Sequence, residues 1–153
     1  MTSNKAIFAA GCFWGVEEIF SKLNGVLSTE VGYSGGTKES PSYEEVCTGR
    51  TGHAEAVLVN FDSNTTSYEL LLEEFWKCHD PTTLNRQGLD IGPQYRSAIF
   101  YFDEYQRDSA INSMQKISGD FDSKIVTEVK EFSNFFPAEE YHQKYIQKKV
   151  KFF

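Results

Sequence analysis

The sequence predicts a mixed α/β protein whose helices pack on a single mixed β-sheet. Strand-like and helix-like segments alternate along the chain in the order β-α-β-β-α-β-α-β-α. There is no internal repeat and no low-complexity stretch, and 153 residues are enough to bury a sizeable core. We therefore expect one domain that spans residues 1–153.

The N-terminal part of the chain predicts a strand, a helix and a second strand. The run 5–10 is short and apolar, as in a buried strand. Over 13–23 apolar residues recur at helical spacing, and the Asn-Gly pair at 24–25 supplies a stop signal. The run 26–33 is the second predicted strand.

A loop, a strand and a helix are expected next. Residues 34–46 are rich in Gly, Ser and Pro, which predicts an ordered loop. Residues 53–61 alternate in polarity, so they predict a strand with two distinct faces. Thr66 and Glu69 have the spacing of a capping box, and the segment 66–79 continues as an amphipathic helix.

The same alternation continues through the second half of the chain. A polar loop over 80–96 leads into a strand over 97–102. Asp103 with Gln106 predicts the cap of another helix, which ends at Gly119.

The last two predicted elements are a strand that completes the sheet and a helix that packs on it. Residues 124–132 form the final strand, and Pro137 suits the first turn of a final helix that runs to about Lys148. The leading β-α-β-β-α-β order predicts a ferredoxin-like core. We therefore expect an α/β (α+β) fold, a two-layer sandwich with helices packed on a mixed β-sheet.

Composition and charge exclude several classes of partner. The net charge of −7 disfavours nucleic acid and anionic membranes. No stretch approaches the ~20 apolar residues of a membrane span, and the N-terminal apolar run is too short for a signal peptide. Three cysteines fit a reducing compartment better than a disulfide scaffold. We expect a cytoplasmic monomer that binds neither nucleic acid nor membrane.

The three cysteines have different surroundings. Cys78 falls on the same helical stripe as Leu71 and Phe75, which predicts a buried and inert thiol. Cys47 lies where strand and loop are hard to separate, and a buried thiol is favoured there too. Cys12 immediately precedes a helical turn, where free N–H groups and the helix dipole favour an anion by ~0.3–1 kcal/mol. That effect is too small to decide between a reactive and a buried Cys12.

Glu55 is a carboxyl on an otherwise apolar strand face. Alternation places it with Val57, Val59 and Phe61. Partial desolvation there raises the pKa of a carboxyl and keeps a proton donor available near neutral pH. The alternative is a salt bridge at the open end of the strand. His53 shares this face and suits either the same site or a hydrogen bond within a turn.

Two predicted loops carry polar side chains that the fold alone does not require. One contains Tyr43, and the other contains Asp90 and Tyr95. Tyrosine hydroxyls beside a carboxylic acid can bind a polar oxygen of a substrate, although tyrosines also cover cores. The cysteines and histidines lack metal-ligand spacing, and the GYSGG stretch lacks the spacing of a phosphate loop. We therefore expect neither a metal site nor a phosphate-binding loop.

These residues lie in motifs that resemble the A class of peptide methionine sulfoxide reductases. The motifs GCFWG, TGHAE and D-x-G-x-Q-Y-R-S occur in order and are highly specific together. The match runs from about Ala6 to Tyr145. Its longest stretches are GCFWGVEEIF, SYEEVCTGRTGHAEAVLVNFD, FWKCHDPTTLNRQGLDIGPQYRSAIF and FFPAEEYHQKY.

The resemblance implies a role for each candidate residue. Cys12 would be the nucleophile and become a sulfenic acid, while Glu55 would protonate the sulfoxide oxygen. Phe13 and Trp14 would form the apolar pocket for the substrate methyl group. The residues implied to hold the oxygen and complete its polar surroundings are Tyr43, Asp90 and Tyr95. The implied reaction is reduction of the S epimer of methionine sulfoxide, free or in proteins, in the repair of oxidised proteins, with no metal or organic cofactor.

The chain departs from the family pattern after its final helix. Many members carry resolving cysteines in a Gly-rich tail, whereas residues 79–153 contain no cysteine. One route for recycling is reduction of the sulfenic acid by an external thiol, either thioredoxin or glutathione with glutaredoxin. The others are resolution by Cys47 and a tail beyond the present sequence. The external thiol is favoured, and Cys78 is the least suited resolver.

Two other functions fit parts of the sequence. A cysteine hydrolase or acyltransferase would pair Cys12 with His53 or His142, and it needs an imidazole within hydrogen-bond reach of the sulfur. A non-catalytic module would bind oxidised methionine without turnover.

Overall fold

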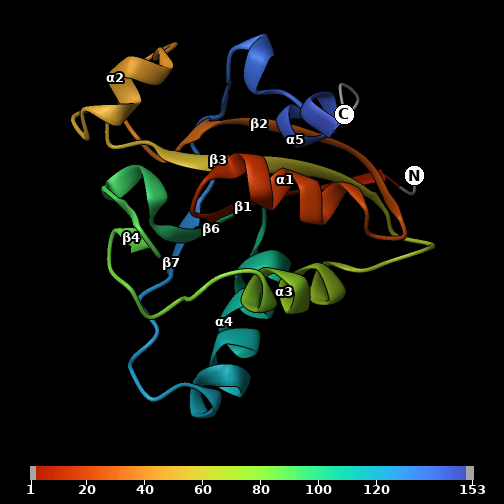
Figure 1. Cartoon of the computed structure of the whole chain (residues 1–153). Coiled ribbons are helices and arrows are strands. Elements are labelled where there is room, and N and C mark those ends of the chain that lie inside the picture. The colour runs from red at the N-terminus through yellow and green to blue at the C-terminus, as the bar shows by residue number, and fades with distance from the viewer. Residues whose placement is uncertain (1–2, 151–153) are drawn as a thin grey trace.

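The computed structural model describes residues 3–150, and its elements follow the predicted alternation (Figure 1). The ferredoxin-like order is formed by β1 (Ser3–Ala10), α1 (Phe13–Ser21), β2 (Val26–Ser34), β3 (Ala54–Asp62), α3 (Tyr68–Lys77) and β6 (Ser97–Tyr101). The main elements that follow are α4 (Glu104–Ile117), β7 (Glu128–Glu131) and α5 (Tyr145–Val150). None of the helices formed by residues 3–150 has the length and apolar character that a membrane span requires.

The main sheet is mixed, as predicted. Its strand order is β7-β6-β1-β3-β2-β8, where β8 is the short strand Phe136–Pro137. All neighbours are antiparallel except β6 and β7, which run parallel. The central order β6-β1-β3-β2 with crossover helices α1 and α3 is the ferredoxin-like arrangement, so the predicted core is confirmed.

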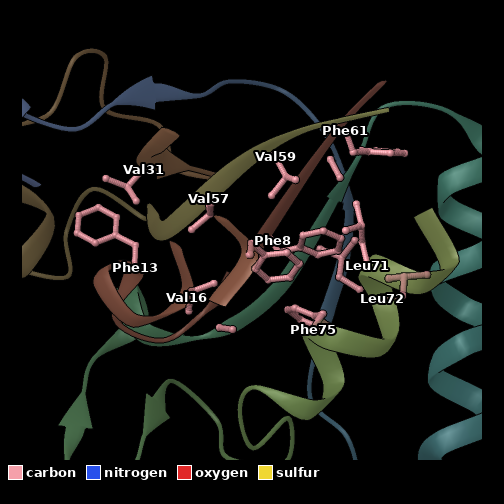
Figure 2. Packing of buried hydrophobic residues seen from close by; sticks show 14 of the residues in the cluster. Phe8, Phe13, Val16, Val31, Val57, Val59, Phe61, Leu71, Leu72 and Phe75 are labelled. Carbon is pink, nitrogen blue, oxygen red and sulfur yellow. The ribbon is translucent and has the colours of Figure 1, made fainter. Parts of the chain in front are cut away.

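Each face of the sheet has its own buried cluster. On the helical face, Phe8 of β1 stacks on Phe20 of α1 at 5.1 Å and lies 5.3 Å from Phe75 of α3, measured between ring centroids. Figure 2 shows Phe8 between strand residues and the helix α3. On the opposite face, Ile7 and its neighbours are covered by the segment 132–135, which crosses from β7 to β8. This crossing carries the C-terminal part of the chain to the edge beside β2.

Both predicted loops contain short regular elements. The loop predicted over 34–46 continues into α2 (Tyr43–Cys47), because Ser42 and Glu45 form a capping box. The loop predicted over 80–96 contains a hairpin and a 3₁₀ turn. These are β4 (Arg86–Gln87), β5 (Asp90–Ile91) and the turn Pro93–Tyr95.

The predicted helix caps are confirmed in one case and shifted in another. The side chain of Asp103 accepts a hydrogen bond from the Gln106 N–H at 2.9 Å and caps α4 as predicted. For α3 the N-cap is Ser67 rather than Thr66. Glu69 does not reach back to the cap, because it accepts hydrogen bonds from side chains of α4 instead.

The prediction of a final helix beginning at Pro137 is wrong. Pro137 lies in the edge strand β8 and pairs with Gly32 of β2. An edge strand tolerates proline because one side of it has no ladder partner. A 3₁₀ turn (Glu140–His142) follows, and α5 starts only at Tyr145. Residues 136–145, the C-terminal segment, therefore comprise the edge strand, the 3₁₀ turn and the start of α5, and they contact α1 and α2.

Candidate active site

Cys12 is the N-cap residue of α1 and directly follows β1. The turn between them depends on Gly11, whose φ of +99° is strained for any other residue. A Cβ at Gly11 would also come within 2.9 Å of the Gln87 side chain of β4. The glycine therefore lets the β4–β5 hairpin approach the backbone beside the thiol.

The thiol of Cys12 is protonated at neutral pH. Burial, together with the negative charges of Glu55 and Asp90, raises the pKa of Cys12 to about 11. The N–H groups of Trp14 and Gly15 lower the pKa but do not compensate. The helix start alone thus fails to produce a thiolate, as its small predicted effect implied.

Glu55 lies directly behind the start of α1. Its side chain is 1% exposed, and its Oε1 accepts a hydrogen bond from the Phe13 N–H at 3.2 Å. Burial is the main reason that the pKa of Glu55 is raised to about 8. The hydrogen bond from the Phe13 N–H lowers this pKa, and the negative charge of Asp90 raises it. No basic side chain among residues 3–150 pairs with Glu55, so the alternative salt bridge does not form.

The second carboxyl oxygen of Glu55 is the decisive atom of the site. Oε2 is buried and has no hydrogen-bond partner in the described part of the chain. At neutral pH the carboxyl is mostly protonated, so it can donate that proton to an oxygen atom of a bound molecule. Sequence alternation predicted a desolvated carboxyl with a raised pKa on this strand face, and the structure agrees with that prediction.

Phe13 and Trp14 lie between Glu55 and the C-terminal segment. Phe13 is buried, with its ring centroid 5.2 Å from that of His142. The Trp14 indole N–H donates to His142 Nδ1 at 2.9 Å, and the Trp14 ring stacks on Tyr145 at 3.8 Å. One face and one edge of Trp14 are thus fixed by residues distant in sequence.

The structure brings the remaining predicted residues around the same point. Tyr43 begins α2, with its ring 4.5 Å from that of His142. Burial is the main reason that the pKa of Tyr95 is raised to about 12, and the negative charges of Glu55 and Asp90 also contribute to this rise. Asp90 is exposed on β5, close enough for its charge to act on Tyr95 and Glu55. These side chains therefore belong to one site.

The other two cysteines have different environments. The favoured interpretation of Cys47 as a buried thiol is wrong: Cys47 is exposed, because α2 turns its last residue toward solvent. Its thiol lies against the hydroxyl of Tyr43. Cys78 is half-buried at the C-cap of α3, where it hydrogen-bonds to the Phe75 carbonyl and burial raises its pKa to about 12. The Cys78 thiol is thus hydrogen-bonded within its own helix.

The histidines do not provide a base for Cys12. His53 accepts from the Gly36 N–H through Nδ1 at 3.0 Å and donates through Nε2 to the Lys38 carbonyl at 2.7 Å. His53 is therefore a turn residue. His142 Nδ1 accepts from Trp14, and neither histidine hydrogen-bonds to the Cys12 sulfur within residues 3–150. The cysteine hydrolase hypothesis lacks its imidazole.

Sequence reasoning missed the C-terminal segment as part of the site. Glu139 accepts hydrogen bonds from the Tyr33 hydroxyl and the Tyr43 N–H, both at 2.8 Å. It thereby joins β2, α2 and the C-terminal segment. The polar and aromatic residues of the FFPAEEYHQKY motif were the available signal, but Pro137 in this motif was predicted to begin a final helix.

Two adjacent residues anchor this segment. The Gln143 amide accepts a hydrogen bond from the Val31 N–H at 2.9 Å and donates one to the Val31 carbonyl at 2.8 Å. The Lys144 ammonium bonds to Glu17 Oε2 at 2.8 Å and to Thr29, and Glu17 is almost completely buried. The position of His142 relative to Trp14 follows from these two contacts.

Comparison with known proteins decides the family. The family model for peptide methionine sulfoxide reductase matches residues 4–152. The chain belongs to this family. A peptide methionine sulfoxide reductase MsrA from Methanothermobacter thermautotrophicus is 57% identical over 146 residues, which cover 94% of this chain and 86% of that relative. The chain is thus a methionine sulfoxide reductase, an oxidoreductase, and the resemblance seen in its motifs is confirmed.

Solved structures of this reductase family share the fold. The reduced form of Mxr1 from Saccharomyces cerevisiae has a TM-score of 0.93 and 34% identity, covering 98% of this chain and 87% of that chain. Mxr1 in complex with Trx2 has a TM-score of 0.68 and 21% identity, covering 94% and 85%. At that identity the second likeness shows the fold alone.

We expect His142 to act on the reductase through Trp14. His142→Phe retains an aromatic ring but removes the acceptor of the indole N–H, and a partly buried donor without a partner costs about 1–3 kcal/mol. The KM for methionine sulfoxide should rise roughly tenfold while kcat changes less, measured by steady-state kinetics. Equal losses in kcat and kcat/KM would contradict a role in positioning Trp14 for substrate binding.

The same contact predicts a pH dependence on the acid side. A protonated imidazole has no acceptor nitrogen, so protonation of His142 breaks its bond to Trp14. Burial lowers the pKa of His142, while Glu139 and Glu44 oppose that shift. The wild-type KM should therefore rise only below the ordinary histidine range, and the KM of His142→Phe should not follow pH there.

Proposed function

We propose that the chain reduces the S epimer of methionine sulfoxide, free or within proteins, with Cys12 as nucleophile and Glu55 as general acid. The observation that carries the proposal is the unpartnered, buried oxygen of a protonated carboxyl beside an N-cap thiol. A sulfoxide offers both an oxygen that accepts this proton and a sulfur that accepts attack by the thiol.

The reaction balances with these two groups. Glu55 gives its proton to the sulfoxide oxygen, which makes the substrate sulfur electrophilic. The sulfur of Cys12 attacks the substrate sulfur and forms an S–S bond. The hydroxyl then passes from the substrate sulfur to Cys12 as the S–O and S–S bonds to the substrate break, which leaves methionine and a Cys12 sulfenic acid. The thiol proton returns to the Glu55 carboxylate, so methionine is released with no net uptake of protons. Positioned general acids contribute roughly 10²–10⁴-fold to such steps.

The surrounding residues favour one configuration at sulfur. Phe13 and Trp14 supply an apolar wall for the methyl group, and Tyr43 and Tyr95 supply hydroxyls near the oxygen, with Asp90 beside them. A site that fixes methyl, oxygen and side chain separately accepts one epimer. The test is reduction of S- and R-epimer sulfoxide peptides with dithiothreitol: reduction of the S epimer alone supports the proposal, and an R preference contradicts it.

External thiols complete the proposed cycle. Two thiols reduce the sulfenic acid to Cys12 and water and form a disulfide. The existence of a solved complex between yeast Mxr1 and Trx2 supports a thioredoxin as the physiological donor, and glutathione with glutaredoxin is the alternative. We propose a cytoplasmic location for the chain, which is consistent with either thiol donor. No metal takes part in this scheme, and residues 3–150 hold no group of three or more metal-binding side chains.

Thiol counting tests the one-cysteine cycle. Without reductant, excess sulfoxide should yield one methionine per chain, and one thiol should disappear on titration in denaturant. Dimedone should label Cys12. The exposed thiol of Cys47 offers the competing route, which consumes two thiols and leaves a Cys12–Cys47 disulfide. Loss of two thiols, prevented by Cys47→Ser, would replace the external-thiol route and leave the reductase assignment intact.

A further inference from the structure

Arg96 is a mostly buried cation that the proposed reaction does not use. It directly follows the 3₁₀ turn Pro93–Tyr95, and its side chain is only 12% exposed. An arginine is always charged, and its burial costs free energy unless its N–H groups find acceptors. The hydrogen bonds of Arg96 therefore indicate which parts of the chain this side chain holds together.

The guanidinium of Arg96 joins three separate segments of the chain. Its Nη2 donates to the Gly52 carbonyl at 2.9 Å, its Nη1 to the Pro93 carbonyl at 2.9 Å and its Nε to Glu128 Oε1 at 3.0 Å. Gly52 lies in the loop before β3, Pro93 begins the 3₁₀ turn, and Glu128 begins the edge strand β7. A planar group with donors in fixed directions can hold all three segments, whereas the ammonium of a lysine cannot.

Two of these segments carry residues of the active site. The loop 51–53 leads directly into β3, where Glu55 is the second residue. His53 of this loop is fixed by hydrogen bonds at both ring nitrogens. The 3₁₀ turn ends at Tyr95, whose pKa is raised by burial and by the negative charge of Glu55. Arg96 therefore connects the turn that carries Tyr95 to the start of the strand that carries the acid.

We propose that Arg96 is a positioning residue for the reduction, because its guanidinium fixes the Tyr95 hydroxyl relative to the Glu55 carboxyl. The proposal rests on the proposed function, in which Tyr95 and Glu55 both act on the sulfoxide oxygen. One oxygen can meet both groups at once only if their separation is fixed, and small misplacements slow such reactions strongly. The two bonds to backbone carbonyls carry this role, whereas the ion pair with Glu128, whose side chain is 43% exposed, contributes little.

A double-mutant cycle tests whether Arg96 acts through Tyr95. Arg96→Lys keeps the charge but loses the planar group, and single-turnover reduction of a saturating S-epimer sulfoxide peptide should slow about tenfold, as for loss of one hydrogen bond to the reacting oxygen. Tyr95→Phe should slow it by a similar factor. In the Tyr95→Phe background, Arg96→Lys should cost less than about twofold, because the hydroxyl that it positions is absent. A tenfold cost in that background would overturn the proposal, as would a Tyr95→Phe enzyme with the wild-type rate.

Two further variants separate geometry from charge. Arg96→Gln is shorter and neutral, and it should lose as much activity as Arg96→Lys. Full activity with lysine but not with glutamine would assign the effect to charge and contradict positioning by the guanidinium. Glu128→Gln removes the ion pair alone and should stay within about twofold of the wild type. A large loss in Glu128→Gln would place the role in β7 and overturn the proposal.

A fluorine label gives a readout that needs no activity. With fluorotyrosine in place of Tyr95, the fluorine NMR signal should be one sharp line in the wild type and in Glu128→Gln. It should be broadened or split in both Arg96 variants, because a ring that is no longer fixed exchanges between positions. A sharp line in a folded Arg96 variant would overturn the proposal, and so would failure of both Arg96 variants to fold, which thermal unfolding detects. A wild type that does not reduce the S epimer but gives the expected NMR result would refute the proposed function and leave the connection between Arg96 and Tyr95 intact.

Discussion

Cys12→Ser should lose methionine sulfoxide reduction by several orders of magnitude. Serine is nearly isosteric, but its hydroxyl is a much weaker nucleophile and cannot take the substrate oxygen as a sulfenic acid. The measurement is single-turnover formation of methionine from an S-epimer peptide. Because Cys12 makes no side-chain cap bond to α1, the substitution should leave folding unchanged, and thermal unfolding checks this.

Two matched variants make the Cys12 result specific. Cys47→Ser and Cys78→Ser should keep the single-turnover rate, because neither sulfur meets the buried oxygen of Glu55 in the proposed mechanism. Residual reduction by Cys12→Ser at a rate comparable to wild type would refute Cys12 as the nucleophile.

Glu55→Gln should slow the single-turnover rate by roughly 10²-fold or more. The amide still fills the buried space and can donate a hydrogen bond, but it carries no transferable proton. Glu55→Asp should also slow the reaction, because it withdraws the acid by about one methylene. Wild-type rates should fall as pH rises through about 8, where the carboxyl ionises, and the Gln variant should lack that decline. A Gln variant with wild-type rates across pH would make Glu55 a structural residue.

Stability provides an independent check on Glu55. The folded-state pKa of Glu55 lies above the value of 4.5 for an unperturbed glutamate, so the native state holds more protons than the unfolded state between these values. The wild type should therefore lose stability as pH rises from about 4.5 to about 8, by on the order of a few kcal/mol from this group. Glu55→Gln should not show that loss, so its stability relative to wild type should increase with pH.

Periodicity made most of the fold and the central acid predictable. Alternation over β3 placed Glu55 among Val57 and Val59 because a strand exposes every second residue to one face, whatever the rest of the fold. Desolvation of that carboxyl followed directly. The pKa of Cys12 was not predictable in the same way, because it depends on burial and on Asp90, which is distant in sequence.

Short elements defined by tertiary pairing escaped prediction. Pro137 is compatible with a helix start and with an edge strand, and only its pairing with Gly32 decides between them. The helix α2 and the β4–β5 hairpin are too short to show a periodicity. As a result, the sequence did not predict that Glu139 and His142 help to hold Phe13 and Trp14 in place, although the motif that contains them was noted.

The late position of the C-terminal segment has a consequence for the order of folding. All strands and helices of the ferredoxin-like core are complete by Tyr101, whereas Trp14 meets its partner His142 across 128 positions of sequence. Contacts so distant along the chain close late, and on the ribosome they close only after the core has emerged. We therefore expect the thiol and the acid to come together before His142 meets Trp14, so that the contact which fixes the Trp14 ring forms late in folding.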